Sequence, residues 1–139
     1  MAGFGEEKSS KKNDKLLRNR QTKGEALLKT AINHHAQGEL INAEKKYREA
    51  IKIGYYNYSI YTNLGVICKN SGRTDEAIQL YKKAIETNPE QPDAYRNLGN
   101  LYQILCDFEN AIEFANKSLA LNPNNPEALI TLGWSSKEL

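Results

Sequence analysis

The chain has 139 residues, a net charge of +2 and 40% hydrophobic residues, a composition typical of one globular domain. No apolar run approaches the ~18 residues of a membrane span, and no apolar stretch follows the basic N-terminus as in a secretory signal. The only two cysteines, Cys68 and Cys106, lie outside any Cys-x-x-Cys pattern. These features argue against a membrane partner or a disulfide framework and predict a cytoplasmic protein.

Residues 1–23 form a basic leader, with seven Lys or Arg residues against three acidic ones, whereas the remainder is slightly acidic. Such a segment can attract phosphate backbones or anionic lipid. No aromatic residue follows Phe4 within it to stack on bases. We therefore interpret residues 1–23 as a flexible, partly helical leader, with nucleic-acid binding through it as the least favoured alternative.

The rest of the chain repeats with a period of 34 residues. The motif Asn63-Leu64-Gly65 returns as Asn97-Leu98-Gly99 and then as Thr131-Leu132-Gly133. The period divides residues 24–139 into the units 24–57, 58–91 and 92–125 and a partial unit 126–139.

The first half of each unit reads as a helix. Tyr61, Leu64 and Cys68 are three or four residues apart, which places them on one face of such a helix. Gly72 follows and is expected to end the helix at a turn. Small residues recur where the two helices of a unit must approach closely: Gly65, Ala77, Ala84, Gly99 and Ala111.

The second half of each unit predicts another helix. Thr74 is a candidate N-cap, and Asp75 and Glu76 favour the positive end of the helix that follows. Pro89 ends this helix. The pair Asn125-Pro126 reads as a cap followed by proline at the first helical position.

This pattern resembles the tetratricopeptide repeat (TPR), a 34-residue helical hairpin. The resemblance covers residues 24–139. It implies an all-α, right-handed solenoid of three full repeats plus a final helix, with a concave groove lined by the first helices. It also implies a protein-interaction scaffold that holds an extended peptide or protein segment in this groove.

The resemblance places position 6 of each unit in the groove, where the chain has Lys29, Asn63, Asn97 and Thr131. An amide side chain both donates and accepts hydrogen bonds, so it can hold a peptide backbone. Asn63 and Asn97 resemble the asparagine ladder in the TPR arm of the O-linked N-acetylglucosamine transferases. The alternative is that asparagine is simply tolerated on an exposed helix face. The predicted groove residues are Asn63, Asn97, Lys69, Asn70, Arg96, Asn100, Gln103, Thr131 and Trp134.

TPR domains that clamp the C-terminal carboxylate of chaperones carry lysine, arginine and asparagine at fixed groove positions. Those positions hold Leu28, Ile32, Asn63, Asp93 and Asn97 in this chain. Only Asn63 matches, and the basic pair that would bind a carboxylate is missing. We do not expect this mode of binding.

No catalytic, cofactor or metal site is expected. His34 and His35 are adjacent and therefore about 100° apart around a helix, and no further ligand follows at zinc-like spacing. The chain has no phosphate loop and no nucleophile motif. The sequence thus predicts a protein that is not an enzyme.

The partial unit 126–139 has no second helix after it, so Leu129, Leu132 and Trp134 would leave an apolar stripe exposed. One interpretation is a longer protein, in which this chain is the substrate-recruiting arm of an enzyme domain beyond residue 139. The leader is similar to those of cyanobacterial multi-repeat TPR proteins, some of which carry a C-terminal enzyme domain. The other interpretation is a homodimer that pairs through this last helix.

Overall fold

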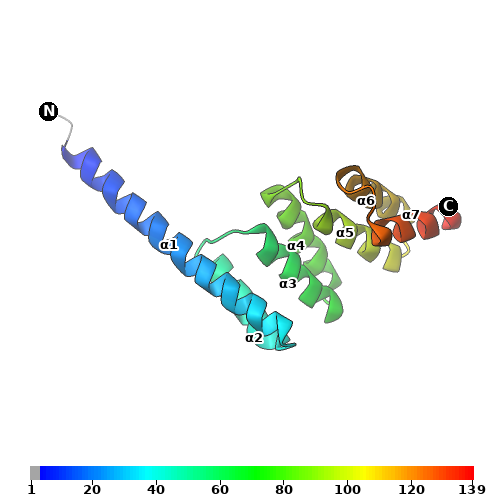
Figure 1. The fold of residues 1–139 in the computed structure, drawn as a ribbon, viewed down its shortest axis with the longest axis horizontal. Helices are drawn as coiled ribbons and strands as arrows, with labels where there is room; N and C mark the ends of the chain where they lie inside the picture. The colour runs from blue at the N-terminus through cyan, green and yellow to red at the C-terminus, as the bar shows by residue number, and fades with distance from the viewer. Residues whose placement is uncertain (1–3) are drawn as a thin grey trace. The chain divides into compact units, whose positions relative to one another are not determined.

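The structure is a computed structural model that describes the backbone of residues 4–139 and the side chains from residue 7 onward. The described residues form seven α-helices and no strand (Figure 1). The helices are α1 (Phe4–Ala36), α2 (Leu40–Lys52), α3 (Tyr58–Asn70), α4 (Thr74–Thr87), α5 (Pro92–Ile104), α6 (Phe108–Leu121) and α7 (Pro126–Glu138). They form two compact units, which divide between Tyr56 and Asn57 and are described separately.

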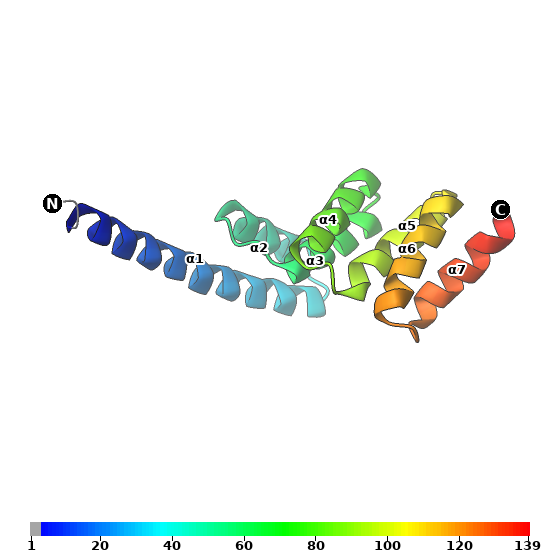
Figure 2. The same cartoon turned by 90° about the horizontal axis from the view of Figure 1, so that it is seen from above.

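The first unit is a hairpin in which α2 packs along the C-terminal half of α1 (Figure 2). Gly24 lies directly beneath the Tyr55 ring, where an added Cβ atom would come within 2.0 Å of the ring. Ala31 and Tyr47 are fully buried between the helices. The Tyr47 ring meets the His35 ring edge-on, with 6.2 Å between the ring centres.

The leader is helical throughout its described part, because α1 continues across residues 23 and 24 without a break. Residues 6–23 contain no glycine or proline and are rich in Lys, Arg, Gln and Leu, which favour helix. All side chains from Glu7 to Lys23 are exposed, and Gly24 is the first buried residue. The predicted boundary between residues 23 and 24 therefore marks where α1 begins to pack against the rest of the first unit, and not where the helix begins.

The second unit contains the hairpins α3–α4 and α5–α6 and the single helix α7 (Figure 2). The helices α3, α5 and α7 begin at Tyr58, Pro92 and Pro126, the first residues of the predicted units. Its core is formed by residues at the repeated positions, among them Ile60, Leu64, Ala77, Tyr81, Leu98, Ala111 and Ala115.

The small residues of the repeat are needed for close helix approach, as predicted. An added Cβ atom at Gly65 would lie 2.6 Å from the Tyr81 ring of α4. At Gly99 it would lie 3.2 Å from the backbone nitrogen of Ala115 in α6. At Gly133 it would meet nothing within 4 Å, because no second helix covers α7.

The turns explain one wrong prediction. Gly72 has a φ of 75° between α3 and α4, and the equivalent turn between α5 and α6 has Cys106 with a φ of 58°. Thr74 is not the N-cap of α4, since α4 begins at Thr74 itself and the N-cap is Arg73, without a side-chain cap bond. The helix α4 therefore begins one residue earlier than it would with Thr74 as its N-cap. The Asn125 cap is confirmed, because its side chain accepts a hydrogen bond from the Ala128 N–H.

Candidate functional site

The helices α3, α5 and α7 are neighbours in the second unit, with α5 packing against both of the others. Their polar side chains make contacts from one helix to the next. Lys69 Nζ in α3 donates to Asn100 Oδ1 in α5 at 3.3 Å. Both side chains are half-buried. The hydrogen bond between them brings two of the predicted groove residues together from different helices.

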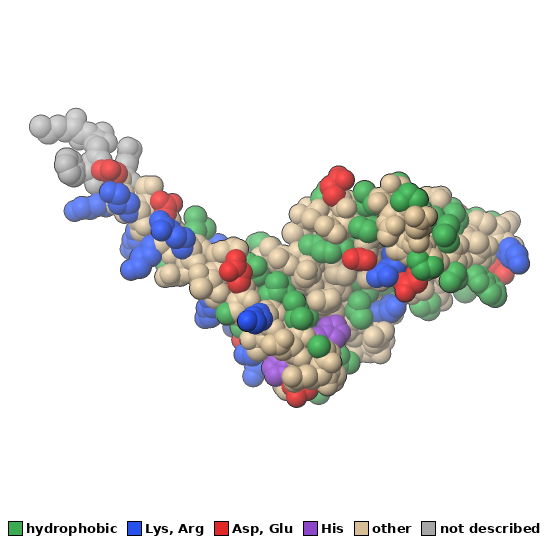
Figure 3. All heavy atoms as spheres, in the orientation of Figure 1, with side chains coloured by type: hydrophobic (Ala, Val, Ile, Leu, Met, Phe, Trp, Pro, Cys, Tyr) green, Lys and Arg blue, Asp and Glu red, His purple; other side chains and the backbone are tan. Residues whose placement is uncertain are grey.

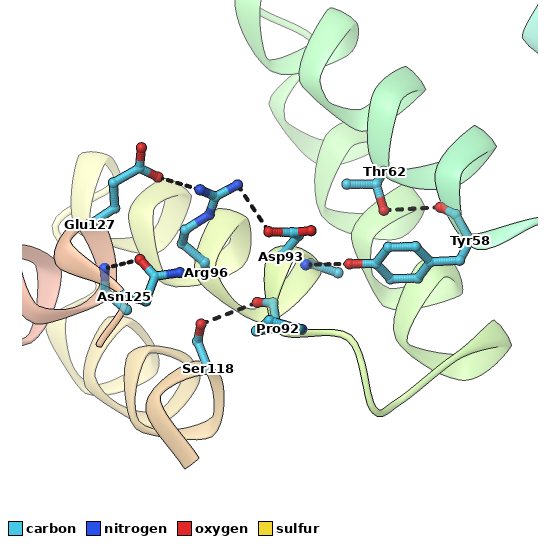
Figure 4. Close-up of polar contacts among 10 residues, drawn as sticks. Tyr58, Thr62, Pro92, Asp93, Arg96, Ser118, Asn125 and Glu127 are labelled. Atoms are coloured by element: carbon cyan, nitrogen blue, oxygen red, sulfur yellow. Dashed lines mark hydrogen bonds and ion pairs between the residues drawn. The ribbon is translucent and has the colours of Figure 1, made fainter. Parts of the chain in front are cut away.

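Arg96 connects α5 to α7. One guanidinium nitrogen lies 2.7 Å from Glu127 Oε2 at the start of α7, and another lies 3.4 Å from Asp93 Oδ1 in its own helix (Figure 4). The Arg96 Nε atom is buried and has no hydrogen-bond partner among the described residues. Two carboxylates therefore compensate the positive charge of Arg96, which is only 26% exposed. Sequence reasoning missed Glu127, although it occupies the same repeat position as Asp93.

Asn63 and Asn97 occupy equivalent positions of α3 and α5, and both are half-buried. Asn70 is exposed at the end of α3, and Gln103 is half-buried near the end of α5. These four amides thus lie on the first helices of two consecutive repeats.

Thr131, one of the predicted groove residues, lies on the buried face of α7. It is only 2% exposed, and Ala128 and Ser135, three and four residues away on the same face of α7, are buried as well. These small side chains form the buried face of α7, which packs on α5 and α6. The asparagine row therefore ends at Asn97 and has no third member on α7.

Trp134 is 63% exposed on α7. With Ile130, Gly133 and Lys137 it lines a surface pocket. Ile130 is 58% exposed and was not among the predicted site residues. Its spacing of four residues from Trp134 is the sequence signal that could have identified it.

Two tyrosines of the second unit have perturbed acidity. Burial raises the pKa of Tyr58, whose hydroxyl lies at the start of α5, and burial also raises the pKa of Tyr81 in the core.

In the part of the chain that the structure describes, no three His, Cys, Asp or Glu side chains are grouped to hold a metal ion. No helix in that part combines the length and apolar character that crossing a bilayer requires.

Comparison with protein-family models decides the family. The model described as TPR repeat matches residues 67–104, and the model described as tetratricopeptide repeat matches residues 92–125. Residues 67–125 of the chain therefore carry tetratricopeptide repeats. The predicted all-α TPR solenoid is thereby confirmed, and the TPR fold is a protein-interaction fold.

Solved structures agree with this fold. The TPR domain of Arabidopsis OM64 is similar with a TM-score of 0.80 and 21% identity, over 86% of this chain and 99% of that one. The first TPR of Spaghetti (RPAP3), bound to the HSP90 peptide SRMEEVD, gives 0.78 and 24%, over 84% of this chain and 93% of that one. MamA gives 0.78 and 22%, over 99% of this chain and 85% of that one. Among curated proteins, no match of significant similarity was found.

Proposed function

We propose that this TPR protein binds an extended peptide or protein segment across the first helices of its second unit. The observation that carries the proposal is the row of half-buried amides on consecutive first helices, at Asn63, Asn97, Asn100 and Gln103. An exposed apolar pocket at Trp134 and Ile130 lies on the next helix. Amides and an apolar anchor are the two kinds of group that hold a peptide in an otherwise polar surface.

The amides would bind the peptide backbone and not its side chains. Neighbouring helices lie about 8–10 Å apart, and an extended chain advances ~3.3 Å per residue. The amides of α3 and α5 would therefore meet the peptide about every third residue. Trp134 and Ile130 would supply the contact that depends on a side chain of the partner, because a large aromatic surface contributes most where it is desolvated.

The charges on this surface argue against an acidic C-terminal tail as the partner. The similar TPR of RPAP3 is bound to an HSP90 peptide. In this chain Asp93 occupies one of the positions where a basic residue would be needed, and the charge of Arg96 is compensated by Asp93 and Glu127. A neutral or basic segment with one apolar residue fits the surface better.

A direct test selects peptides from a random library against the whole protein and measures their dissociation constants by fluorescence anisotropy. The variant Asn63→Ala/Asn97→Ala should bind about tenfold or more weakly, because each lost hydrogen bond contributes about 1 kcal/mol. The matched control is Asn116→Ala/Asn124→Ala, which removes two exposed asparagines from α6 and the following turn. Equal affinity of both variants and the wild type would contradict the proposal.

A second measurement separates backbone from side-chain binding. Methylation of single backbone nitrogens in the selected peptide should weaken binding at residues about three apart. Alanine substitution at the same peptide residues should have little effect. The opposite pattern would assign recognition to side chains and leave the asparagines without the proposed role.

A second candidate function is homodimer formation through α7. Leu129 is 50% exposed on this helix beside Ile130 and Trp134, and the surface at Gly133 is open. Sedimentation velocity over a range of concentrations would show a dimer that Leu129→Glu abolishes. A monomer at every concentration would contradict it. The role as recruiting arm of a longer enzyme stays a prediction.

We also propose a cytoplasmic location, in line with the two cysteines. Neither cysteine forms a disulfide, and Cys68 is buried whereas Cys106 is exposed. A fluorescent fusion that collects at a membrane or outside the cell would contradict this location.

A further inference from the structure

We infer that the N-terminal half of α1 binds the phosphate backbone of nucleic acids, independently of sequence and of the peptide site. In a flexible leader the charged side chains would have no fixed arrangement, whereas in a continuous helix their spacing decides which of them lie on the same side. The helix α1 runs through the whole described part of the leader, and every side chain from Glu7 to Lys23 is exposed.

The positive charges of this segment lie on one side of the helix. At 3.6 residues per turn, six cations fall within a sector of about 140° and over about 22 Å of helix length. We call this sector the basic face. Its cations are Lys8, Lys11, Lys12, Lys15, Arg18 and Lys23.

The basic face points away from the packed side of α1. The residues that pack against α2 and Tyr55, such as Gly24 and Ala31, lie about 160° around the helix from the middle of the basic face. In Figure 3 the Lys and Arg side chains of this helix follow mainly one edge of it. All six side chains are exposed, and only Arg18, at the edge of the basic face, lines a surface pocket with Gly54, Tyr55 and Tyr56.

The acidic residues of the segment flank the basic face and do not interrupt it. Glu7 and Asp14 lie just beyond the sector that contains Lys11 and Arg18. Lys11 and Glu7 form an exposed ion pair at 3.6 Å, which contributes little and exchanges readily with solvent or another anion. The other five cations of the basic face form no ion pair with an acidic side chain that the structure describes.

The composition of the basic face favours nucleic acid over a membrane or a protein. Between Lys8 and Lys23 its only other residues are Asn19 and Thr22, so no apolar side chain lies within it. A membrane-bound helix needs an apolar face to insert, and a protein interface needs buried anchors. Lys, Arg, Asn and Thr are the residue types that contact phosphate oxygens.

The test measures binding of a fluorescein-labelled DNA duplex of random sequence, and of a single-stranded RNA, to the full chain by anisotropy. If each cation neutralises one phosphate, the logarithm of the association constant should fall against that of the salt concentration with a slope of about −5 for duplex DNA. A weaker slope of about −4 is expected for the single strand.

The decisive variant moves three cations to the opposite side of α1 without changing composition or net charge. It exchanges the residues of three pairs that lie two positions apart: S10K/K12S, N13K/K15N and Q21K/K23Q. Its helix content should be unchanged by circular dichroism, and its duplex affinity at about 0.1 M salt should be at least tenfold weaker. Its salt slope should fall to between about −3 and −4, because three cations remain on the basic face and the three moved lysines join only Arg20 on the other side.

Three outcomes would overturn the inference. The first is equal affinity and slope for the wild type and the exchange variant, since binding would then follow net charge and not the basic face. The second is absence of nucleic-acid binding by the wild type at about 0.05 M salt. The third is binding to phosphatidylserine-containing vesicles without binding to DNA or RNA.

Discussion

The hydroxyl of Tyr58 accepts a hydrogen bond from the backbone N–H of Ala94 at 3.0 Å, across 36 residues of sequence. Tyr58 is the first residue of α3, and Ala94 lies in the first turn of α5. The N-cap residue of α5, Gln91, makes no side-chain cap bond. Ser118 of α6 donates a hydrogen bond to the Pro92 carbonyl at 3.1 Å (Figure 4). The start of α5 is therefore held by two other helices and not by its own cap.

Tyr58→Phe should lower the free energy of unfolding by about 1 kcal/mol, the typical contribution of a helix cap. The ring remains in place, and only the acceptor for the Ala94 N–H is lost. Urea denaturation followed by circular dichroism measures the change. Tyr56→Phe, on an exposed tyrosine, is the control and should have no effect. Equal stabilities of both variants would show that the bond contributes nothing.

Alanine substitution of Gly65 and of Gly133, which occupy equivalent repeat positions, should change the stability of the protein in opposite directions. Gly65→Ala should destabilise the protein by about 1–3 kcal/mol, because the new methyl group meets the Tyr81 ring at 2.6 Å. Gly133→Ala should stabilise it by up to about 1 kcal/mol, since alanine favours helix and nothing lies nearby. Thermal denaturation of the two variants checks both signs. Destabilisation by Gly133→Ala would mean that its surface is covered in solution.

The ion pair between Arg96 and Glu127 should contribute little and depend on salt. Glu127 is 66% exposed, so Glu127→Gln should cost at most about 1 kcal/mol. The loss should shrink when the salt concentration rises from about 0.02 M to about 0.5 M, because salt screens exposed charges. Urea denaturation at both concentrations measures it. Glu113→Gln, which breaks the pair with Lys117 within α6, serves as control.

Stability should fall above pH about 10, where tyrosines ionise in the unfolded chain. Burial raises the pKa of Tyr81 in the folded state, so the unfolded state loses its proton first as the pH rises. The contribution of Tyr81 to the free energy of unfolding is present in full below the pKa of tyrosine in the unfolded chain. It is lost as the pH rises from there toward the raised pKa of the folded state. Tyr81→Phe should therefore reduce the decline in unfolding free energy between pH 8 and pH about 11. An unchanged decline in the variant would contradict the raised pKa.

Tyr81→Phe should also be harmless at neutral pH. The Tyr81 hydroxyl is buried and has no hydrogen-bond partner among the described residues. Removing a buried, unpaired hydroxyl should change the free energy of unfolding by less than about 1 kcal/mol, and in the stabilising direction. The same urea titrations at pH 8 provide this value. A large loss of stability would indicate that the hydroxyl is bonded in solution.

Most of the fold was predictable because the repeat places the same residue types at the same packing positions. Leu64 and Leu98 are fully buried, and the helices begin at the predicted first residues of three units. The site was predictable only in part. Position 6 alone does not decide whether a side chain is exposed, and Thr131 is buried because α7 packs through its small residues.

Two other features required three-dimensional contacts. The bond from Ala94 to Tyr58 joins residues that no local pattern relates, and sequence rules expect a cap from a neighbouring residue. The pairing of Arg96 with Glu127 likewise depends on how α7 packs on α5. The sequence predicts a flexible, partly helical leader, whereas α1 runs without a break from Phe4 to Ala36, because the residues of the leader favour helix.

The turn at Cys106 gives the protein a built-in position for chemical labelling. Its thiol is exposed at the α5–α6 turn, whereas the thiol of Cys68 is buried in α3. Under native conditions a maleimide dye should therefore couple to one residue only, without any engineered substitution. A fluorophore attached there would report on the α5–α6 hairpin from its outer end, so the same labelled sample could follow both peptide capture and unfolding.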